Sequence, residues 1–520
     1  MTLDLKLCSR ARLARDARFD GKFYIAVLTT RIYCRPICRS RTSQEKNVRY
    51  FPTAAAAAEA GFRPCLRCRP ECSPGTAAWA GTKNTVSRAL RLINETGLEE
   101  GGIEALAAHL GLGSRHLRRL FLRHLGASPR AVAQTRRLHF AKKLIDETAL
   151  PMTQIAIAAG FGSVRRFNAA VHKVYARTPT ELRRRVIKKF AAQPDNQYLF
   201  HLDYRPPYAW REMLAALRAL ATPGTECVAD DAYRRTLTVN GIRGHLEVAP
   251  SKERHSLEVR VCIEEPRPLF LIIERVRAMF DLDADWPAIE RVLKADPGLA
   301  ARIRACPGLR VAGCWSGFEL ALHAMLSGPP APAGSPPPAS TIGALVASFG
   351  ARVDFAPGLT HIFPTAEALA DADLRRAGLS RADSLAVRTF ARAARDGRIA
   401  FDKVADPEAL LRELSVMQGF TPAAVEYVAM RTLREPDAFP LQPGEVRRSL
   451  GLEETAEIER RTSAWRPWRA YAAAYLAGAG APQASLRISR RKSSTSASEV
   501  AYEVTSRTAA PSAASMSGQR

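Results

Sequence analysis

Four cysteines in two closely spaced pairs are the residues of this sequence best suited to chemistry. Three residues separate Cys34 from Cys38, two separate Cys65 from Cys68, and 26 lie between the pairs. This spacing is typical of a tetrahedral zinc site, because each short interval lets two sulfurs reach one ion from a single turn. Four cysteines with no histidine nearby indicate an all-sulfur site for one Zn²⁺. Spacing alone favours a structural zinc knuckle over a reactive centre.

The elements that must position these cysteines change character along the chain. A β-like stretch from Phe23 to Ile32 leads into Cys34. Downstream, residues 82–185 show the apolar periodicity of helices, and 197–310 mix helix with alternating strands. The elements expected after residue 190 are a helix at Trp210–Leu220, strands at Arg234–Val239 and Ser256–Ile263, helices from Gly313 to about Tyr475, a non-helical proline-rich stretch at Gly328–Ser340 and a disordered tail at 478–520.

Positive charge is concentrated in the first third of the chain. Residues 1–190 hold 36 Lys and Arg against 13 Asp and Glu, a net of +23 out of the total of +26. The remaining residues hold 41 against 38, a net of +3. A generally arginine-rich composition would have raised both parts. A basic part joined to a nearly neutral part predicts nucleic acid as the partner of the first.

No feature of the sequence predicts a membrane or secreted protein. There is no apolar run near 18 residues and no signal-peptide pattern, so we expect a cytoplasmic protein with no membrane partner. Ten cysteines in such a protein indicate reduced thiols or metal ligands rather than a disulfide framework.

Two similar helical units lie within residues 82–185. An apolar helix face that starts at Ile103 recurs 49 residues later at Met152. Each unit continues with a glycine, a serine and a second amphipathic helix, which is the order of a helix-turn-helix. The outward faces of the second helices carry Arg115, Arg118, Arg119 and Arg123 in one unit and Arg165, Arg166 and Lys173 in the other. Tandem units would reach successive major grooves, and the alternative is the solvated basic face of a helical bundle.

The cysteine pairs lie in stretches that resemble the N-terminal domain of the Ada-type DNA methyl-phosphotriester repair proteins: FDGKFYIAVLTTRIYCRPICRSR and FRPCLRCRPE. The resemblance covers most of residues 1–75. It implies that Cys34 takes a methyl group from a phosphotriester of the DNA backbone and that the other three cysteines are supporting ligands. The DNA-contacting positions that it implies are Thr30, Arg39, Arg41 and Arg63. Cys72 lies just outside the pattern and is expected to be a bystander.

The implied chemistry is physically sensible. Zinc keeps a thiol deprotonated at neutral pH, and only the thiolate is nucleophilic. Four thiolates on one Zn²⁺ carry a net charge of about −2, and methylation of Cys34 would change it to about −1, because a thioether is neutral. Weaker repulsion from DNA phosphates would then raise DNA affinity. The acceptor is not regenerated, so we expect a single-turnover DNA-methylphosphotriester:cysteine methyltransferase.

The paired helical units resemble the AraC-type DNA-binding domain over their full length, especially in IAIAAGFGSVRRFNAAVHKVYARTPTELR. This implies regulation of transcription at promoter sites on double-stranded DNA, with RNA polymerase as a candidate partner. The expected DNA partners of the whole chain are therefore promoter sites and alkylated DNA. The residues expected at the DNA are Ser114, Arg115, Arg118, Ser163, Arg165 and Arg166. No PCHR-like motif occurs, so repair of O6-alkylguanine is not predicted.

Residues 197–475 resemble the 3-methyladenine DNA glycosylase II family, of helix-hairpin-helix type. The matching stretches are YRPPYAW, DDAYRRTL, PGLRVAGCWSGFELALHAML, EYVAMRTLREPDAFP and AWRPWRAY. Members of this family flip out an alkylated purine and cleave its glycosidic bond with the help of one aspartate. The resemblance therefore implies DNA-3-methyladenine glycosylase activity in base excision.

The chain departs from this family where the chemistry takes place. The catalytic aspartate falls on Pro443, which has no carboxylate, and Glu445 is the only nearby substitute. The second hairpin glycine falls on Thr421, the base-stacking tryptophan on Ala423 and another aromatic pocket position on Ala477. The domain is therefore expected to be an inactive DNA-binding relic. The alternatives are weak activity through Glu445 or another group, and local frameshifts in the sequence, because close family matches flank each altered stretch.

Together these observations predict a multidomain, mainly α protein with α+β parts that responds to and repairs DNA alkylation damage. Two alternatives are an active DNA-3-methyladenine glycosylase and an AraC-type regulator with a purely structural zinc site. The expected domains are a small zinc-thiolate domain at 1–78, an AraC-type paired helix-turn-helix at 82–188, an α+β glycosylase N-terminal domain at 197–311, an all-α helix-hairpin-helix domain at 312–477 and the tail at 478–520.

Overall fold

The structure is a computed structural model, and the residues that it describes are 3–74, 85–96, 102–184, 196–327, 339–402, 404, 406–441, 443–451 and 454–478. They all belong to one compact unit, Met1–Ala481. Most of the proline-rich stretch and all but the first residue of the expected tail lie outside the described residues. Among the described helices, none combines the length and the apolar character that crossing a membrane requires.

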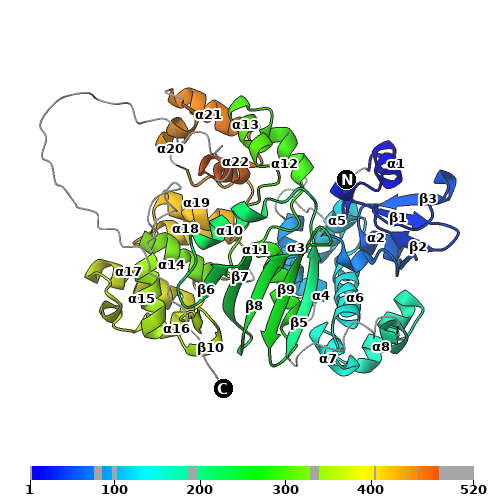
Figure 1. Cartoon of the computed structure of the whole chain (residues 1–520), viewed down its shortest axis with the longest axis horizontal. Helices are drawn as coiled ribbons and strands as arrows, with labels where there is room; N and C mark the ends of the chain where they lie inside the picture. Colours follow the sequence, from blue (N-terminus) through cyan, green and yellow to red (C-terminus); the bar gives the residue numbers. More distant parts are fainter. Residues whose placement is uncertain are drawn as a thin grey trace, which may run out of the picture. The chain divides into compact units, whose positions relative to one another are not determined.

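The N-terminal residues fold around a small four-stranded sheet (Figure 1). Its elements are α1 (Leu5–Leu13), η1 (Ala17–Phe19), β1 (Tyr24–Val27), β2 (Ile32–Cys34), η2 (Glu45–Asn47), β3 (Val48–Phe51), α2 (Ala54–Glu59), β4 (Arg63–Pro64) and η3 (Pro70–Cys72). The strand order is β3-β1-β2-β4, with β2 and β4 parallel and the other pairs antiparallel. The single β-like stretch expected at Phe23–Ile32 is in fact two strands, because Arg31 takes a left-handed φ of 56° and closes a turn between them.

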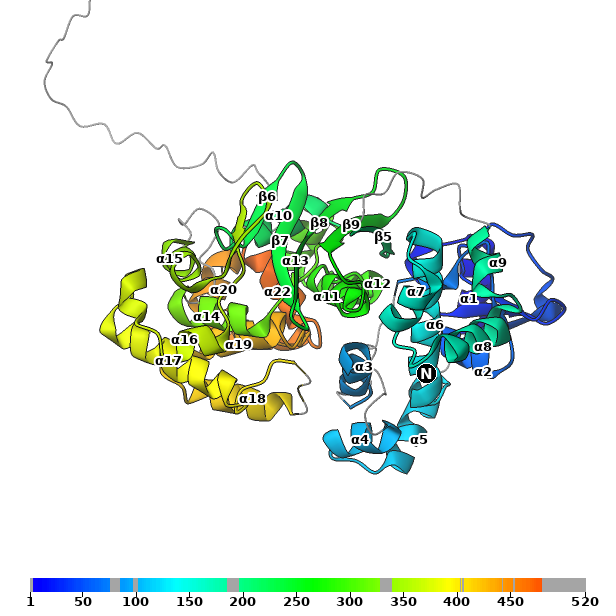
Figure 2. The ribbon, with the colours of Figure 1, turned by 90° about the horizontal axis from the view of Figure 1, so that it is seen from below.

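Two helix-turn-helix units joined by one long helix follow the sheet. Their elements are α3 (Thr85–Thr96), α4 (Gly102–His109), α5 (Ser114–Leu125), α6 (Pro129–Glu147), α7 (Met152–Ala158), α8 (Val164–Tyr175) and α9 (Pro179–Arg184). The units α4–α5 and α7–α8 each turn at a glycine with positive φ, Gly111 at 69° and Gly160 at 75°. Both α7 and α9 contact α6, so the second unit is grouped around this helix (Figure 2).

The two units do not repeat at a single spacing. The first helices match at 49 residues, but the buried residues of the second helices, Leu117 and Phe167, match at 50. Ser163 is the N-cap of α8 and accepts a hydrogen bond from a backbone N–H at 3.2 Å. Gly113 occupies that place in the first unit, and Ser114 is the first residue of α5. Both recognition helices therefore start at the expected serine, but the two serines differ in position by one residue, because the first turn is one residue shorter.

A five-stranded antiparallel sheet forms the next region. Its elements are β5 (Gln197–Asp203), α10 (Trp210–Arg218), β6 (Glu226–Ala229), β7 (Ala232–Val239), β8 (Ile242–Pro250), β9 (Ser256–Ile263), α11 (Leu269–Met279), α12 (Trp286–Leu293) and α13 (Pro297–Ala305). The strand order is β5-β9-β8-β7-β6. Asn240 and Gly241 join β7 to β8 with positive φ values of 52° and 80°, as a two-residue hairpin requires. The two strands and the helix expected here are present, with ends shifted by at most two residues.

The last region is helical with one exception. Its elements are α14 (Gly317–Ser327), α15 (Ala339–Phe349), β10 (Arg352–Ala356), β11 (Leu359–His361), α16 (Ala366–Ala370), η5 (Leu374–Ala377), α17 (Arg381–Arg395), α18 (Pro407–Ser415), α19 (Pro422–Arg431), α20 (Pro443–Leu450), α21 (Thr455–Ala464) and α22 (Arg469–Leu476). The hairpin β10–β11 corrects the all-α expectation, because Gly358 reverses the chain at a φ of 82°. The helix α15 also takes in the last two residues of the stretch that was expected to be non-helical.

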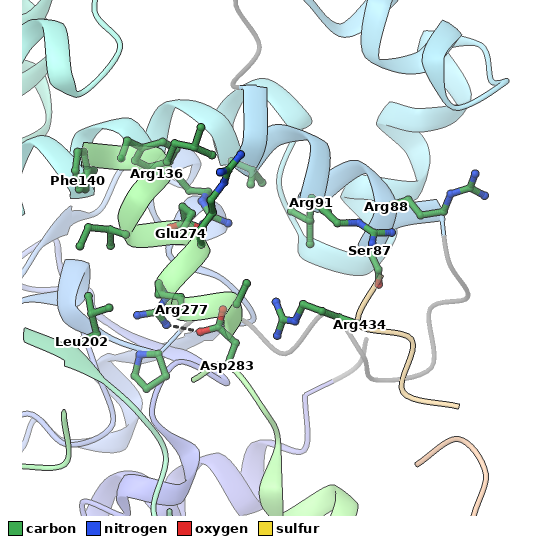
Figure 3. Close-up of a pocket in the computed structure, with 18 of the residues that line it drawn as sticks. Ser87, Arg88, Arg91, Arg136, Phe140, Leu202, Glu274, Arg277, Asp283 and Arg434 are labelled. Carbon is green, nitrogen blue, oxygen red and sulfur yellow. Dashed lines mark hydrogen bonds and ion pairs between the residues drawn. The ribbon is translucent and has the colours of Figure 1, made fainter. Parts of the chain in front are cut away.

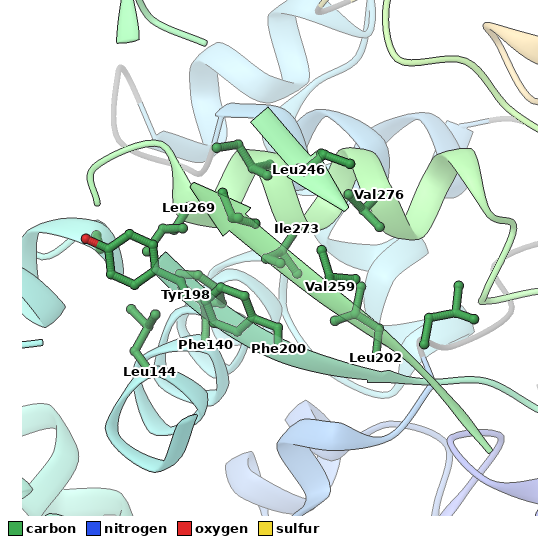
Figure 4. Packing of buried hydrophobic residues seen from close by; sticks show 14 of the residues in the cluster. Phe140, Leu144, Tyr198, Phe200, Leu202, Leu246, Val259, Leu269, Ile273 and Val276 are labelled. Carbon is green, nitrogen blue, oxygen red and sulfur yellow. The ribbon is translucent and has the colours of Figure 1, made fainter. Parts of the chain in front are cut away.

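One apolar core runs from the helix-turn-helix region into the five-stranded sheet. Phe140 and Leu144 of α6 pack with Tyr198 and Phe200 of β5 and with α11 (Figure 4). The ring of Phe140 lies edge-on to that of Phe270, with centroids 5.0 Å apart. Each buried Å² of such apolar surface contributes about 25 cal/mol to stability. The helix α6 is therefore part of the core of the sheet region as well as of the helix-turn-helix units.

Candidate metal centre and nucleic-acid interface

The two cysteine pairs meet at one edge of the N-terminal sheet. Cys34 is the last residue of β2, and Cys65 directly follows β4. Because β2 and β4 are parallel neighbours, their carboxyl ends lie side by side, and the Cys65 N–H donates to the Tyr33 carbonyl at 3.0 Å. The four sulfurs of Cys34, Cys38, Cys65 and Cys68 all lie within 4.8 Å of one another. Sequence spacing predicted this set, and the parallel strand pair explains how the two halves come together.

A tight turn after each strand brings the second cysteine of each pair to the first. The Cys38 N–H donates to the Arg35 carbonyl at 3.1 Å, and the Arg69 N–H donates to the Cys65 carbonyl at 3.1 Å. Arg69 takes a left-handed φ of 53°, which ends the second turn immediately after its ligand. Four sulfurs at the Zn–S distance of roughly 2.3 Å form a tetrahedron with edges of about 3.8 Å. Sulfur separations of at most 4.8 Å are compatible with that geometry.

Without a cation the four thiols cannot all be deprotonated. Hydrogen bonding with Cys38 raises the pKa of Cys34 well above its usual value, and hydrogen bonding with Cys34 lowers the pKa of Cys38. Hydrogen bonding with Cys34 also lowers the pKa of Cys65 to about 6 and raises that of Cys68 strongly. The sulfurs therefore share protons when they are alone. A thiolate-binding divalent cation replaces those protons, so the donor set fits one Zn²⁺.

Arg35, the residue after Cys34, is buried and fully engaged. Its guanidinium contacts the Asp20 carboxylate and lies 2.8 Å from an Oδ atom of Asp203 on β5. Its backbone N–H donates to Cys68 Sγ at 3.4 Å, and its side chain donates to the Cys68 carbonyl at 3.3 Å. Sequence reasoning missed this residue, although its place directly after a ligand cysteine was a usable signal. Arg35 therefore connects the second cysteine pair to β5 of the five-stranded sheet.

The residues expected to contact DNA lie on the surface. In the N-terminal domain they sit around the cysteine cluster, on the β1–β2 turn, after the first cysteine pair and on β4; all four are exposed, and they are Thr30, Arg39, Arg41 and Arg63. On the recognition helices all the expected arginines are exposed, and Ser114 is half-buried. Exposure leaves these groups accessible to a polyanion.

The helix-hairpin-helix region lacks the features of a glycosylase hairpin. Thr421 caps α19, and its Oγ1 accepts from the Ala424 N–H at 3.2 Å. Ala423, at the position where the resemblance expects the base-stacking tryptophan, is buried at 7% exposure. Pro443 is the first residue of α20 and Glu445 is in its first turn. The hairpin and the start of α20 are therefore formed by residues that do not match the expected chemistry.

A cavity of about 700 Å³ lies between α3, α6, α11 and the segment after α19 (Figure 3). Its charged lining is of both signs: Arg136 is 2.5 Å from Glu274, and Arg277 contacts Asp283. Because these basic and acidic side chains pair with each other, the described lining of the cavity lacks the excess of positive charge that a phosphate-binding site would have. None of the residues predicted for chemistry lines it.

Three protein-family profiles match separate parts of the chain. Residues 7–71 match the metal binding domain of Ada, residues 106–185 match a helix-turn-helix domain, and residues 199–316 match the AlkA N-terminal domain. The first match contains all four clustered cysteines, and the second contains both recognition helices. The resemblances inferred from the motifs are thereby confirmed.

Similar proteins cover nearly the whole chain. A Mycobacterium tuberculosis protein named "Probable bifunctional transcriptional activator/DNA repair enzyme AlkA" is 38% identical over 481 residues, which are 91% of this chain and 96% of that protein. The Escherichia coli "DNA-3-methyladenine glycosylase 2" is 29% identical over 54% of this chain and 96% of its own length. A solved structure, "NMR structure of E. Coli Ada protein in complex with DNA", is 36% identical over 25% of this chain and 91% of that chain, with a TM-score of 0.13.

Proposed function

Because this chain belongs to the family of bifunctional transcriptional activator and DNA repair enzymes, we propose that Cys34 is the methyl acceptor of a single-turnover DNA repair reaction. The observation that carries the proposal is the four-sulfur cluster, in which Cys34 is only partly buried and ends a strand at the edge of the sheet. Its supporting ligands are Cys38, Cys65 and Cys68. The substrate is a methyl phosphotriester in the backbone of double-stranded DNA.

The proposed reaction is a displacement at the methyl carbon. A bound Zn²⁺ supplies the positive charge that keeps all four sulfurs deprotonated at neutral pH. Cys34 Sγ forms a bond to the methyl carbon as the bond from that carbon to the phosphate oxygen breaks. A thiolate and a neutral triester become a thioether and a phosphodiester anion, so atoms and charge balance without a further reactant. Nothing regenerates the thiolate, which limits each molecule to one turnover.

The exposed residues around Cys34 and on the recognition helices are proposed to bind DNA both before and after methylation of Cys34. Around the acceptor, the proposed contacts to the sugar-phosphate backbone are Thr30, Arg39, Arg41 and Arg63. On the recognition helices, the proposed contacts in the major grooves are Ser114, Arg115, Arg118, Ser163, Arg165 and Arg166. We place the domain limits at 1–78, 82–188, 197–311 and 312–477. RNA polymerase is the proposed partner of the promoter-bound protein.

Peptide mapping after exposure to DNA with methyl phosphotriesters tests the proposed function. We expect one methyl group on Cys34 and none on Cys72, which is buried at 8% exposure and whose pKa is raised by burial to about 11. Cys34→Ser is expected to abolish the transfer. Methylation at another cysteine, or none, would end the proposal for Cys34, and the absence of any methyl group would favour a regulator with a structural zinc site.

Promoter titration of the same samples tests the DNA contacts. Arg118→Ala is expected to lower affinity by about tenfold in both methylation states, the usual effect of losing a base contact. Cys34→Ser is expected to remove the part of the affinity that depends on methylation. Arg211→Ala, an exposed arginine on α10, is the matched control and should change neither.

We propose that residues 312–477 retain a glycosylase-like fold without glycosylase activity. The support is the absence of a carboxylate at Pro443 together with the buried Ala423 at the hairpin. Purified protein is expected to release no 3-methyladenine from methylated DNA, as measured by chromatography of freed bases. If release is detected, Glu445→Gln decides whether that carboxylate is responsible, since a neutral amide cannot stabilise a developing positive charge.

A further inference from the structure

We propose that a buried polar cluster beneath the sulfurs couples the methylation state of Cys34 to the second recognition helix, α8. The relay cluster, as we call it, consists of Tyr33, Arg69, Glu71, His139, Asp146 and Tyr175. This inference rests on the proposed function of Cys34 and deepens it, because it assigns a route from the acceptor to promoter binding. Its members come from the metal-binding domain, from α6 and from α8.

The first link runs from the acceptor strand to α6. Tyr33 precedes Cys34 on β2, and neighbours on a strand point to opposite faces, so its ring projects away from the sulfurs. The Tyr33 hydroxyl lies 2.9 Å from His139 Nε2 in a hydrogen bond. Tyr33 is 1% exposed, and burial lowers the pKa of His139 to about 4, so the imidazole is neutral at pH 7. A displacement of β2 would therefore shift the hydrogen-bonded His139, near the middle of α6.

The second link runs from the other cysteine pair to the end of the same helix. Arg69, the residue after Cys68, lies with its Nε 3.0 Å from Asp146 and its NH2 3.1 Å from Glu147, both on the last turn of α6. Glu71 lies 3.6 Å from Lys142, one turn earlier. The partners Lys142, Asp146 and Glu147 are buried, and Arg69 is half-buried. Separating a buried carboxylate from its cation leaves an uncompensated charge. The metal-binding domain and α6 are thus expected to move together.

The third link brings in the recognition helix. Tyr175 is the last residue of α8 and is 3% exposed. Its hydroxyl and Asp146 Oδ1 are both buried and lack a hydrogen-bond partner among the residues that the structure describes. Tyr175 belongs to the same buried apolar cluster as Leu144 and Ile145, the residues that precede Asp146 on α6. In addition, α8 contacts β4, the strand that leads to Cys65.

These links give methylation a mechanical consequence. Turning Cys34 into a thioether changes its bond to the metal and removes one negative charge from the sulfur cluster. Both cysteine-bearing strands would adjust, and the packed interior passes the shift on because it contains little free space. The helix α8 would respond, since its last residue, Tyr175, packs in one cluster with residues of α6 and the helix also contacts β4. Coupling of this kind is reciprocal, so promoter binding by α8 would also favour the methylated state.

Variants that cut the first link test the relay in the full-length protein with its metal bound. Tyr33→Phe and His139→Leu each remove the hydrogen bond while keeping apolar bulk. In the parent protein, methylation of Cys34 is expected to raise promoter affinity by at least about fivefold, the lower end of usual allosteric coupling. Each variant should still accept one methyl on Cys34, but its affinity gain should fall below about twofold. Hydrogen exchange of α8 should change on methylation in the parent and not in the variants.

The matched control is Tyr24→Phe. Tyr24 is a buried tyrosine of the same sheet, its ring packs edge-on against that of Tyr33, and its hydroxyl is hydrogen bonded to Ser73 at 2.6 Å rather than to α6. This variant should keep the full affinity gain. A full gain in both Tyr33→Phe and His139→Leu would overturn the relay while leaving the proposed function intact. Absence of a methyl group on Cys34 of the parent protein would instead overturn the proposed function, and the relay with it.

Discussion

Removal of the metal is expected to unfold the N-terminal sheet and to loosen α6. The four thiols share protons when no cation is present, and the sheet is too small for its apolar core alone to hold it. Structural zinc contributes about 10–16 kcal/mol to comparable small sites. After chelation, hydrogen exchange should show loss of protection in β1 to β4 and faster exchange in α6. The five-stranded sheet should keep its protection, because the apolar core that it shares with α6 is also built from its own strands and from α10 and α11.

Cysteine variants distinguish the effect of losing a zinc ligand from the effect of losing any cysteine. Cys38→Ala is expected to lower zinc affinity by more than the roughly 10- to 100-fold that loss of an outer partner causes, and to unfold the sheet in the same way as chelation. Cys262→Ala removes a cysteine of similar exposure on β9 and should retain one zinc per chain. Full protection of β1 to β4 in the metal-free parent protein would show that the apolar core suffices.

Acidification is expected to destabilise the protein through His139. Burial lowers its pKa to about 4 in the folded chain, against about 6.5 when unfolded. Between these values the unfolded chain binds a proton that the folded chain does not, so this part of the stability is complete above pH 6.5 and is lost as the pH falls toward 4. From pH 7.5 to 4.5 the loss is about 2 to 3 kcal/mol. Denaturant unfolding followed by circular dichroism at both pH values measures it.

His139→Gln should reduce that pH dependence by the same amount, because glutamine does not titrate. Tyr33→Phe is the informative comparison, since it removes the hydrogen bond to His139 but keeps the buried imidazole. It should lower stability at both pH values and leave the difference between them nearly unchanged. Equal pH dependence in the parent protein and in His139→Gln would mean that other buried groups account for the acid sensitivity.

Local spacing was sufficient to predict the metal centre and the recognition helices. The two cysteine pairs each close within one turn, so the ligand set follows from neighbours in sequence. Amphipathic periodicity likewise predicted α5 and α8 with their exposed arginines. Two local details lay outside these patterns. Arg31 splits one expected strand into two, and the shorter first turn puts Gly113 at the cap of α5 and Ser114 one residue later.

The chemical groups of this protein, and the helices and strands that carry them, follow from its sequence. The buried partners that those groups contact follow from how the elements pack. Tyr33 and His139 are 106 residues apart, and Arg35 and Asp203 are 168 apart, yet both pairs are in contact. No periodicity marks such pairs, because they form where packed elements happen to bury polar groups that then need partners. The proposed coupling between Cys34, α6 and α8 therefore depends on contacts made by the fold rather than on any motif.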